Sequence, residues 1–266
     1  MNRLPGIEID ARANELLAAL PDATWNRWET QLRRVELECG QGVGRAGNGP
    51  AYVLFPTTAI VSLLCMTPDG ACAEVGVVGN DGVVGISDVL GGDGVPGQSV
   101  VQGAGQGYRL PAKVVMNEIN AGGAVLNIML RYSHTLFAQV AQTALCNRYH
   151  SIDQQFCRRL LVGLDRSPSD QLQMTHASMA NLLGVRREGI SAAAHKLQQA
   201  GIIQYSRGHV VVQDREELEQ RTCECYWIGK LEHRRVPDVA VSRMPARPAH
   251  LWTRGVSARS GFVMGA

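Results

Sequence analysis

The chain has 266 residues, of which 45% are hydrophobic and 19% charged, with 26 Lys or Arg against 24 Asp or Glu. A chain of this length can bury more than one core, so we expect two domains and a tail. The formal net charge of +2 excludes a strongly basic protein, although a DNA-binding protein contacts DNA through one face and not through its average surface.

The sequence shows neither of the two signals that would direct the chain to a membrane or out of the cell. It has no run of about 18 apolar residues, and its start, MNRLPGIEID, lacks the apolar core of a signal peptide. We therefore expect a cytoplasmic protein with no membrane partner. The seven cysteines are odd in number and lack framework spacing, which indicates reduced thiols.

The pattern of apolar residues changes near residue 35. Residues 1–34 carry apolar side chains at helical spacing, so we expect this region to be mostly helical. From Val35 to Pro111, short apolar runs alternate with glycine, which is typical of a small antiparallel β-barrel or roll. The predicted strand segments are 51–55, 60–66, 73–78, 83–86 and 99–102.

A long helix is predicted over 123–150, which contains no proline and no glycine after Gly123. One stripe of this helix follows a 4-3-4-3-4 spacing, which is typical of a coiled-coil seam. The alternative is a helix that packs only on its own roll, because Val125, Met129, Tyr132 and Leu136 widen the stripe. A helix apolar on more than one side has two partners to contact, so we expect a homodimer. The seam residues are Leu126, Leu130, Ser133, Phe137, Val140 and Ala144.

The segment 172–208 reads as two short helices around a glycine turn, followed by a two-stranded hairpin. Thr175 can cap the first helix, Gly184 supplies the turn, and Gly201 ends the second helix. The second helix has one apolar face, formed by Ile190, Ala193, Ala194 and Leu197. A hairpin around Arg207 and Gly208 completes a winged helix-turn-helix, preceded by a further helix over 151–164.

The opposite face of the second helix is suited to reading DNA. Arginine fits the O6 and N7 acceptors of guanine, and glutamate can accept from cytosine N4, so Arg187 and Glu188 can read adjacent base pairs. The alternative is an ordinary solvated charged face, which explains the pair equally well in isolation. We expect the DNA-binding residues to be Thr175, His176, Arg186, Arg187, Glu188, Ser191, His195 and Arg207.

The run 179–190, followed by Ala200-Gly201-Ile202-Ile203 and Tyr205-Ser206-Arg207-Gly208, resembles the winged helix-turn-helix of the Crp/Fnr transcriptional regulators. The resemblance implies an α+β chain: an N-terminal antiparallel β-roll like a cyclic-nucleotide-binding jelly roll, a long dimerisation helix and the winged domain. It also implies a homodimer on pseudo-palindromic double-stranded DNA, RNA polymerase as partner, and base contacts from Arg187 and Glu188. A further family arginine aligns with Ala192, so one base contact is missing.

The same resemblance supplies a test for an effector. Nucleotide-binding members hold the ribose with a Gly-Glu segment and the phosphate with an Arg-Ser pair; here the matching positions are Gly85-Ile86 and Gln98-Ser99. Loss of the guanidinium removes the bidentate bonds on which a buried phosphate depends. We therefore expect no response to cyclic AMP or cyclic GMP, and the effector stays unknown.

Metal, cofactor and catalytic sites are not expected. Every histidine lies after residue 133, which argues against a cupin-like metal enzyme on the roll. The cysteines do not cluster as an iron–sulfur sensor requires. Cys146 and His150 lie one helical turn apart and Cys157 follows, but an isolated pair is typical of helix packing; Cys223 and Cys225 are a second isolated pair. A thiol redox role stays open.

No catalytic motif is found, so an enzyme is the last of three hypotheses. The first is a dimeric transcriptional regulator; the second is a sensor subunit that acts on a protein partner and does not read DNA sequence. A helix is predicted over 214–228, followed by a basic tail rich in proline. The predicted divisions are 1–122 for the helices and roll, 123–150 for the dimerisation helix, 151–229 for the winged domain and 230–266 for the tail.

Overall fold

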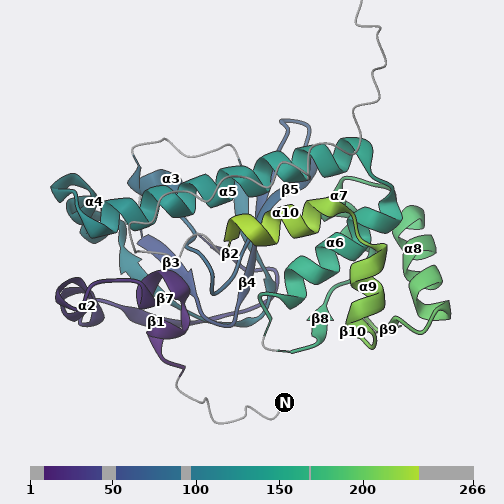
Figure 1. Cartoon of the computed structure of the whole chain (residues 1–266), viewed down its shortest axis with the longest axis horizontal. Coiled ribbons are helices and arrows are strands. Elements are labelled where there is room, and N and C mark those ends of the chain that lie inside the picture. The colour runs from purple at the N-terminus through teal and green to yellow at the C-terminus, as the bar shows by residue number, and fades with distance from the viewer. Residues whose placement is uncertain (1–8, 44–51, 91–96, 168, 234–266) are drawn as a thin grey trace, which may run out of the picture.

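The computed structural model describes residues 9–43, 52–90, 97–167 and 169–233. A β-roll with short N-terminal helices lies at one end of the molecule and a winged helix-turn-helix at the other, and one long helix, α5 (Ala124–Tyr149), runs across both (Figure 1). This is the predicted α+β architecture. All seven cysteines are free.

The roll consists of two antiparallel sheets with strand orders β1-β7-β3 and β2-β6-β4-β5. The strands are β1 (Arg33–Leu37), β2 (Gly42–Val43), β3 (Tyr52–Pro56), β4 (Ile60–Met66), β5 (Cys72–Val78), β6 (Gly97–Gly103) and β7 (Gly105–Pro111). Strand β3 is buried on both faces: Leu54 packs in one apolar cluster with Val61 and Val101, while Val53 and Phe55 pack in another with the N-terminal helices and α5.

The sequence prediction was wrong at one strand of the roll and missed others. Segment 83–86 forms only a single bridge, between Val84 and Leu54, and then enters the short helix α3 (Ile86–Val89). Gly85, with a φ of 93°, turns the chain out of the extended conformation. Strands β1 and β7 pair with each other along five residues, yet they carry too few apolar side chains to show as strands in the sequence.

Short helices close the N-terminal end of the roll: the turn η1 (Ala11–Ala13), α1 (Glu15–Ala18) and α2 (Asp22–Glu29). The helical prediction for 1–34 is confirmed from residue 11 to residue 29, while residues 33 and 34 belong to β1 and residues 1–8 lie outside the described residues. Asn14 fixes this cap, because its buried side-chain amide donates to the carbonyls of Pro56 and Gly82, both at 2.8 Å.

The predicted long helix is confirmed as α5, preceded by α4 (Ala112–Ala121), which the sequence analysis did not separate from the roll. α5 packs along β5 through directional bonds: Gln139 bonds both the N–H and the carbonyl of Val77, at 2.9 and 3.3 Å, and Tyr132 donates to the carbonyl of Val83 at 2.9 Å. The helix is therefore fixed in rotation as well as in position, and His150 ends it.

The winged domain begins at Ser151, whose side chain caps α6 (Ile152–Leu164) in a capping box with Gln154. It continues through β8 (Gln171–Gln173), α7 (His176–Leu183), α8 (Arg187–Gln199), β9 (Ile203–Ser206) and β10 (His209–Val212). Its hydrophobic core also includes Ile60 and Val77 of the roll. The two domains therefore share one continuous apolar interface.

Two buried ion pairs cross this interface. The guanidinium of Arg159, on α6, lies 2.6 Å from Glu74 of β5, with side chains only 5% and 7% exposed, and Arg166 lies 2.8 Å from Asp81. Glu74 also accepts a hydrogen bond from Ser62. Moving a charged side chain out of water costs several kcal/mol, and only close pairing with an opposite charge offsets that cost. These contacts therefore fix the position of the winged domain on the roll.

The C-terminal helix predicted over 214–228 is two helices in the structure. α9 (Arg215–Arg221) is capped by Asp214, the chain turns at Thr222 and Cys223, and α10 (Glu224–His233) returns along α5 (Figure 1). The predicted boundary between 229 and 230 falls inside α10, and the rest of the predicted tail lies outside the described residues. Within the described ranges, no helix combines the length and the apolar character needed to cross a bilayer.

We expect Arg159→Met to lower the free energy of unfolding by about 3–5 kcal/mol, because it leaves the buried Glu74 carboxylate without its partner charge. The double variant Glu74→Leu with Arg159→Met recovers most of the loss, since no unpaired charge remains. Urea unfolding measures both. Arg27→Met is the control, because the partly exposed pair between Arg27 and Glu118 contributes about 1 kcal/mol or less; equal losses in the single and double variants would refute this account.

Candidate nucleic-acid interface

Capping residues set both ends of α7, the first helix of the helix-turn-helix. Thr175 Oγ1 accepts from the Ser178 N–H at 3.0 Å, while Ser178 Oγ accepts from the Thr175 N–H at 2.9 Å, which closes a capping box. Gly184 ends α7 in the left-handed region, with a φ of 65°, where a side chain would be strained. The turn therefore sends the chain directly into α8.

α8 has one buried face and one exposed face. Ile190, Ala193, Ala194 and Leu197 are at most 4% exposed and pack into the core of the winged domain. Small residues allow a close approach: a Cβ at Gly189 would lie 2.8 Å from Ile152 of α6. The opposite face is left in solvent.

The exposed face of α8 carries the charged side chains that the sequence analysis selected. Arg186, Arg187, Glu188 and His195 are exposed, and within the described part of the chain their side chains form no hydrogen bond or ion pair. Ala192 is also exposed, so the missing family arginine leaves an open position on this face. Lys196 instead pairs with Asp153 at 2.7 Å.

Two of the predicted contact residues bond each other. His176 Nδ1 lies 2.9 Å from Ser191 Oγ, and the imidazole meets the ring of Tyr205 edge to face at 4.4 Å. Burial, together with the nearby charge of Arg187, holds the pKa of His176 below its usual value, so the ring is neutral at neutral pH. His176 and Ser191 thus link the start of α7, α8 and the wing.

The tip of the wing lies beside the start of α7. Arg207 and Gly208 have φ values of 49° and 81°, which form the tight hairpin turn between β9 and β10 that the sequence predicts. The Gly208 carbonyl accepts from the Met174 N–H at 2.7 Å, which places the tip against the residue before Thr175. Arg207 is exposed at this tip.

The four positions matched to the family's nucleotide site lie on two different elements of the roll. Gly85 caps α3, and Ile86 is 8% exposed in the core that also contains Trp28 and Phe55. Gln98 and Ser99 lie at the start of β6, opposite Leu64 and Leu63 of β4. A cavity of about 390 Å³ lies elsewhere, between the roll, α5, α6 and α10; its lining includes Asp81, Arg158, Arg166, Tyr226 and Lys230, and none of the predicted effector residues.

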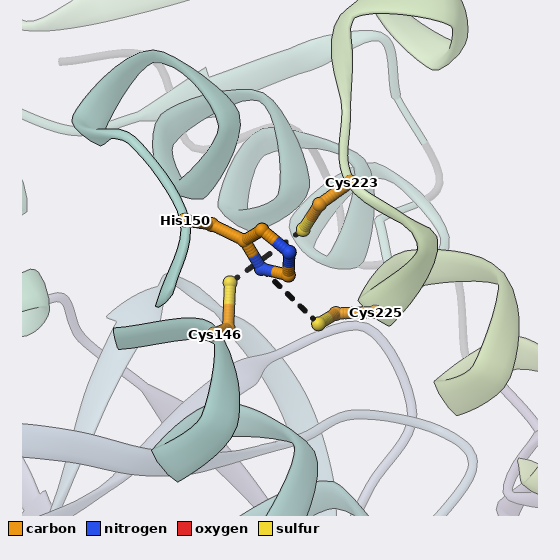
Figure 2. Close-up of side chains that lie close together, drawn as sticks. All are labelled: Cys146, His150, Cys223 and Cys225. Carbon is orange, nitrogen blue, oxygen red and sulfur yellow. Dashed lines mark hydrogen bonds between the residues drawn. The ribbon is translucent and has the colours of Figure 1, made fainter. Parts of the chain in front are cut away.

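The fold brings together two pairs that the sequence analysis judged separately. Cys146 and His150, at the end of α5, meet Cys223 and Cys225, at the start of α10, with all four ligand atoms within 4.8 Å of one another (Figure 2). The two pairs are therefore not isolated in the folded chain, and each pair supplies ligands that the other lacks. Cys157 is not part of this group: it is buried in the winged-domain core, where burial raises its pKa to about 12.

The grouped thiols differ in acidity. Hydrogen bonds from Cys146 and Cys223, with a further bond from the Gln142 amide at 3.1 Å, lower the pKa of Cys225. Hydrogen bonding to its neighbours and burial raise the pKa of Cys146.

Comparison with known protein families identifies the C-terminal domain. Residues 154–221 match the family described as the Crp-like helix-turn-helix domain. The chain carries a Crp-like helix-turn-helix. This match spans α6 to α9, and thus contains all eight predicted DNA-binding residues. A search of curated protein sequences finds no match to the chain.

Solved structures extend the likeness to the whole fold of the Crp/Fnr regulators. A Crp/Fnr-family protein from Eubacterium rectale superposes with a TM-score of 0.62 at 18% identity, over 79% of this chain and 98% of the other. The Crp/Fnr-family regulator TTHA1359 of Thermus thermophilus gives 0.57 at 17%, over 71% and 97%. The c-di-GMP-responsive global regulator CLP of Xanthomonas campestris gives 0.56 at 16%, over 72% and 99%. At these identities the likeness shows the fold.

Proposed function

We propose that this protein is a non-enzymatic transcriptional regulator of the Crp/Fnr type that binds a pseudo-palindromic DNA site as a homodimer. The observation that carries the proposal is the outer face of α8, where Arg187 and Glu188 stand in solvent on a helix fixed by its opposite face. To read base edges, a helix must be held rigidly and must present side-chain hydrogen-bond donors and acceptors that have no partner within the protein. The protein would act in the cytoplasm and contact RNA polymerase.

The remaining predicted contacts have different roles in this proposal. Arg207 at the wing tip and Arg186 before α8 would bind phosphate, as would the exposed start of α7 at Thr175. His176 and Ser191 would act by holding α7, α8 and the wing in register, since they bond each other. Specificity would then come mainly from Arg187 and Glu188, with His195 one turn further along the groove.

The dimer would form along α5. Phe137 and Leu130, both on the predicted seam, are 73% and 51% exposed. They lie on the side of α5 away from Thr135 and Gln142, which contact α10. Large apolar side chains exposed in a row on one helix mark an interaction surface, and a second copy of α5 is the partner whose seam matches.

The signal would not be cyclic AMP or cyclic GMP. Ile86 is part of the roll's core and Gln98 cannot supply a guanidinium fork, so the phosphate would lose its charged partner. A protein of the same fold is described as responsive to c-di-GMP, so other ligands remain compatible with the roll.

The DNA-reading assignment is tested with duplexes selected from genomic fragments by the full-length protein. We expect Arg187→Ala with Glu188→Ala to abolish the preference for the selected site over a scrambled duplex, because each bidentate pair contributes about 1–3 kcal/mol of discrimination. Fluorescence anisotropy measures both affinities. The charge-matched control is Lys113→Ala with Glu29→Ala, which removes one charge of each sign from exposed residues outside the winged domain. Unchanged discrimination in the double variant would contradict the assignment, and a wild-type chain without sequence preference would favour action on a protein partner.

For the dimer, Phe137→Glu is expected to reduce the mass measured by sedimentation equilibrium from two chains to one, because it places two like charges in an apolar seam. The control is Met116→Glu, since Met116 is 37% exposed on α4, away from the seam. A wild-type protein that stays monomeric at every concentration would contradict the dimer.

For the effector, cyclic AMP and cyclic GMP are expected to leave the thermal unfolding temperature unchanged. A ligand that binds only the folded state raises stability in proportion to its saturation, so scanning calorimetry over a range of nucleotide concentrations decides the question. A rise that grows with nucleotide concentration would show that the roll binds the nucleotide without the guanidinium.

A further inference from the structure

We propose that Cys146, His150, Cys223 and Cys225 bind one zinc ion that fastens the C-terminal helices to the end of α5. The four side chains come from two segments far apart in the sequence and point toward one another (Figure 2). The three sulfurs are at most 2% exposed. Three cysteines with one histidine form one of the ligand sets of structural zinc sites.

The spacing fits a single tetrahedral ion. A zinc–sulfur bond of about 2.3 Å and a zinc–nitrogen bond of about 2.0 Å place neighbouring ligand atoms about 3.5–3.8 Å apart around a tetrahedron. The Sγ atoms of Cys146 and Cys223 are 3.6 Å apart, and Cys225 Sγ lies 3.4 Å from His150 Nδ1. The remaining pairs are within 4.8 Å, so side-chain adjustments of less than a bond length complete the site.

The histidine is held in the form that a metal requires. His150 Nε2 lies 3.3 Å from Glu224 Oε1, while Nδ1 points to the sulfurs. A carboxylate that accepts from Nε2–H leaves the lone pair of Nδ1 free for the ion, which is the usual arrangement around zinc-bound histidine. Packing alone does not explain a carboxylate on one ring nitrogen and three sulfurs around the other.

The surroundings also suit the charge of a zinc–thiolate centre. Gln142 donates from its amide to Cys225 Sγ, and the positive charge of Arg158 acts on Cys146. Three thiolates and one Zn²⁺ carry a net charge of −1, which such a donor and cation would stabilise. On binding, the thiols release their protons to solvent.

Two other uses of the thiols fit less well. An iron–sulfur cluster contains at least two iron atoms, each with its own protein ligands, and needs more room than four atoms within 4.8 Å provide. A disulfide between Cys146 and Cys223 would not account for the positions of Cys225, His150 and Glu224 beside these two sulfurs. A single ion uses all of them.

The site would act as a clamp. Cys146 belongs to α5, His150 ends that helix at the joint with α6, Cys223 lies between α9 and α10, and Cys225 is in the first turn of α10. One ion would therefore join the long helix, the joint between the domains and the C-terminal pair of helices. Metal binding would contribute to the stability of the folded chain.

The test uses full-length protein, stripped of metal under reducing conditions and titrated with Co²⁺ and then Zn²⁺. We expect one Co²⁺ per chain, with the absorption bands of a tetrahedral ion bound to thiolates, and displacement by Zn²⁺. Cys225→Ser should lose this spectrum, whereas Cys39→Ser, at an exposed cysteine outside the group, should keep it. Circular dichroism checks that each variant folds.

A second variant keeps all four ligands. Glu224 is 65% exposed, so Glu224→Gln should fold, yet it should weaken Zn²⁺ binding about 10–100-fold by loosening the histidine; Glu216→Gln, on exposed α9 surface, should not. The proposal is overturned if bound Co²⁺ shows no thiolate absorption bands, or if Glu224→Gln and Glu216→Gln bind Zn²⁺ with equal affinity. It is also overturned if the isolated protein contains iron with inorganic sulfide, or if it binds no metal and contains a Cys146–Cys223 disulfide.

Discussion

The buried pairs Glu74–Arg159 and Asp81–Arg166 decide how the two halves of this molecule are placed. Each pair joins a carboxylate of the roll to an arginine of the winged domain, Arg159 within α6 and Arg166 two residues after its end, and in the Glu74 pair both side chains are less than 8% exposed. Apolar contacts alone tolerate sliding, because one aliphatic surface packs on another with small loss. A buried charge does not, since a shift of a few ångströms leaves it unpaired at a cost of several kcal/mol.

Close backbone approach makes these pairs possible. A Cβ at Gly79 would lie 2.7 Å from the stem of Arg166, and one at Gly76 would lie 2.9 Å from the Gln139 side chain. Gly76 lets α5 approach β5, and Gly79, just after β5, lets the segment that follows α6 approach the roll, so this part of the roll orients both the predicted dimerisation helix and the start of the winged domain. The geometry of α8 relative to α5 follows from that strand.

The helix-turn-helix could be predicted because capping, turn and core residues close together in the sequence specify it. Strands β1 and β7 of the roll and the cysteine–histidine group lack such local patterns. Thr175, Gly184 and the apolar face of α8 each specify their own element within a few residues, and all agree. The strand predicted at 83–86 does not form because Gly85 adopts a left-handed backbone conformation in the middle of three apolar residues. The grouping of Cys146 with Cys223 depends on a turn at residues 222–223 that lets α10 pack along α5, and no local sequence pattern predicts that packing.

His176 and Ser191 were selected from the sequence as DNA contacts, but only the folded chain shows that they bond each other.

The placement of these features bears on how a signal could act on the proposed regulator. The outer face of α8 shares no hydrogen bond with the roll among the described residues, so a change in the roll cannot alter Arg187 or Glu188 directly. It can alter their position relative to a second copy, because that position depends on the joint at His150 and Ser151. The buried ion pairs hold the winged domain on the roll, and the proposed zinc ion would hold the joint itself through His150. A signal that regulates DNA binding would therefore act by changing one of these attachments or the apolar interface that Ile60 and Val77 form with the winged domain.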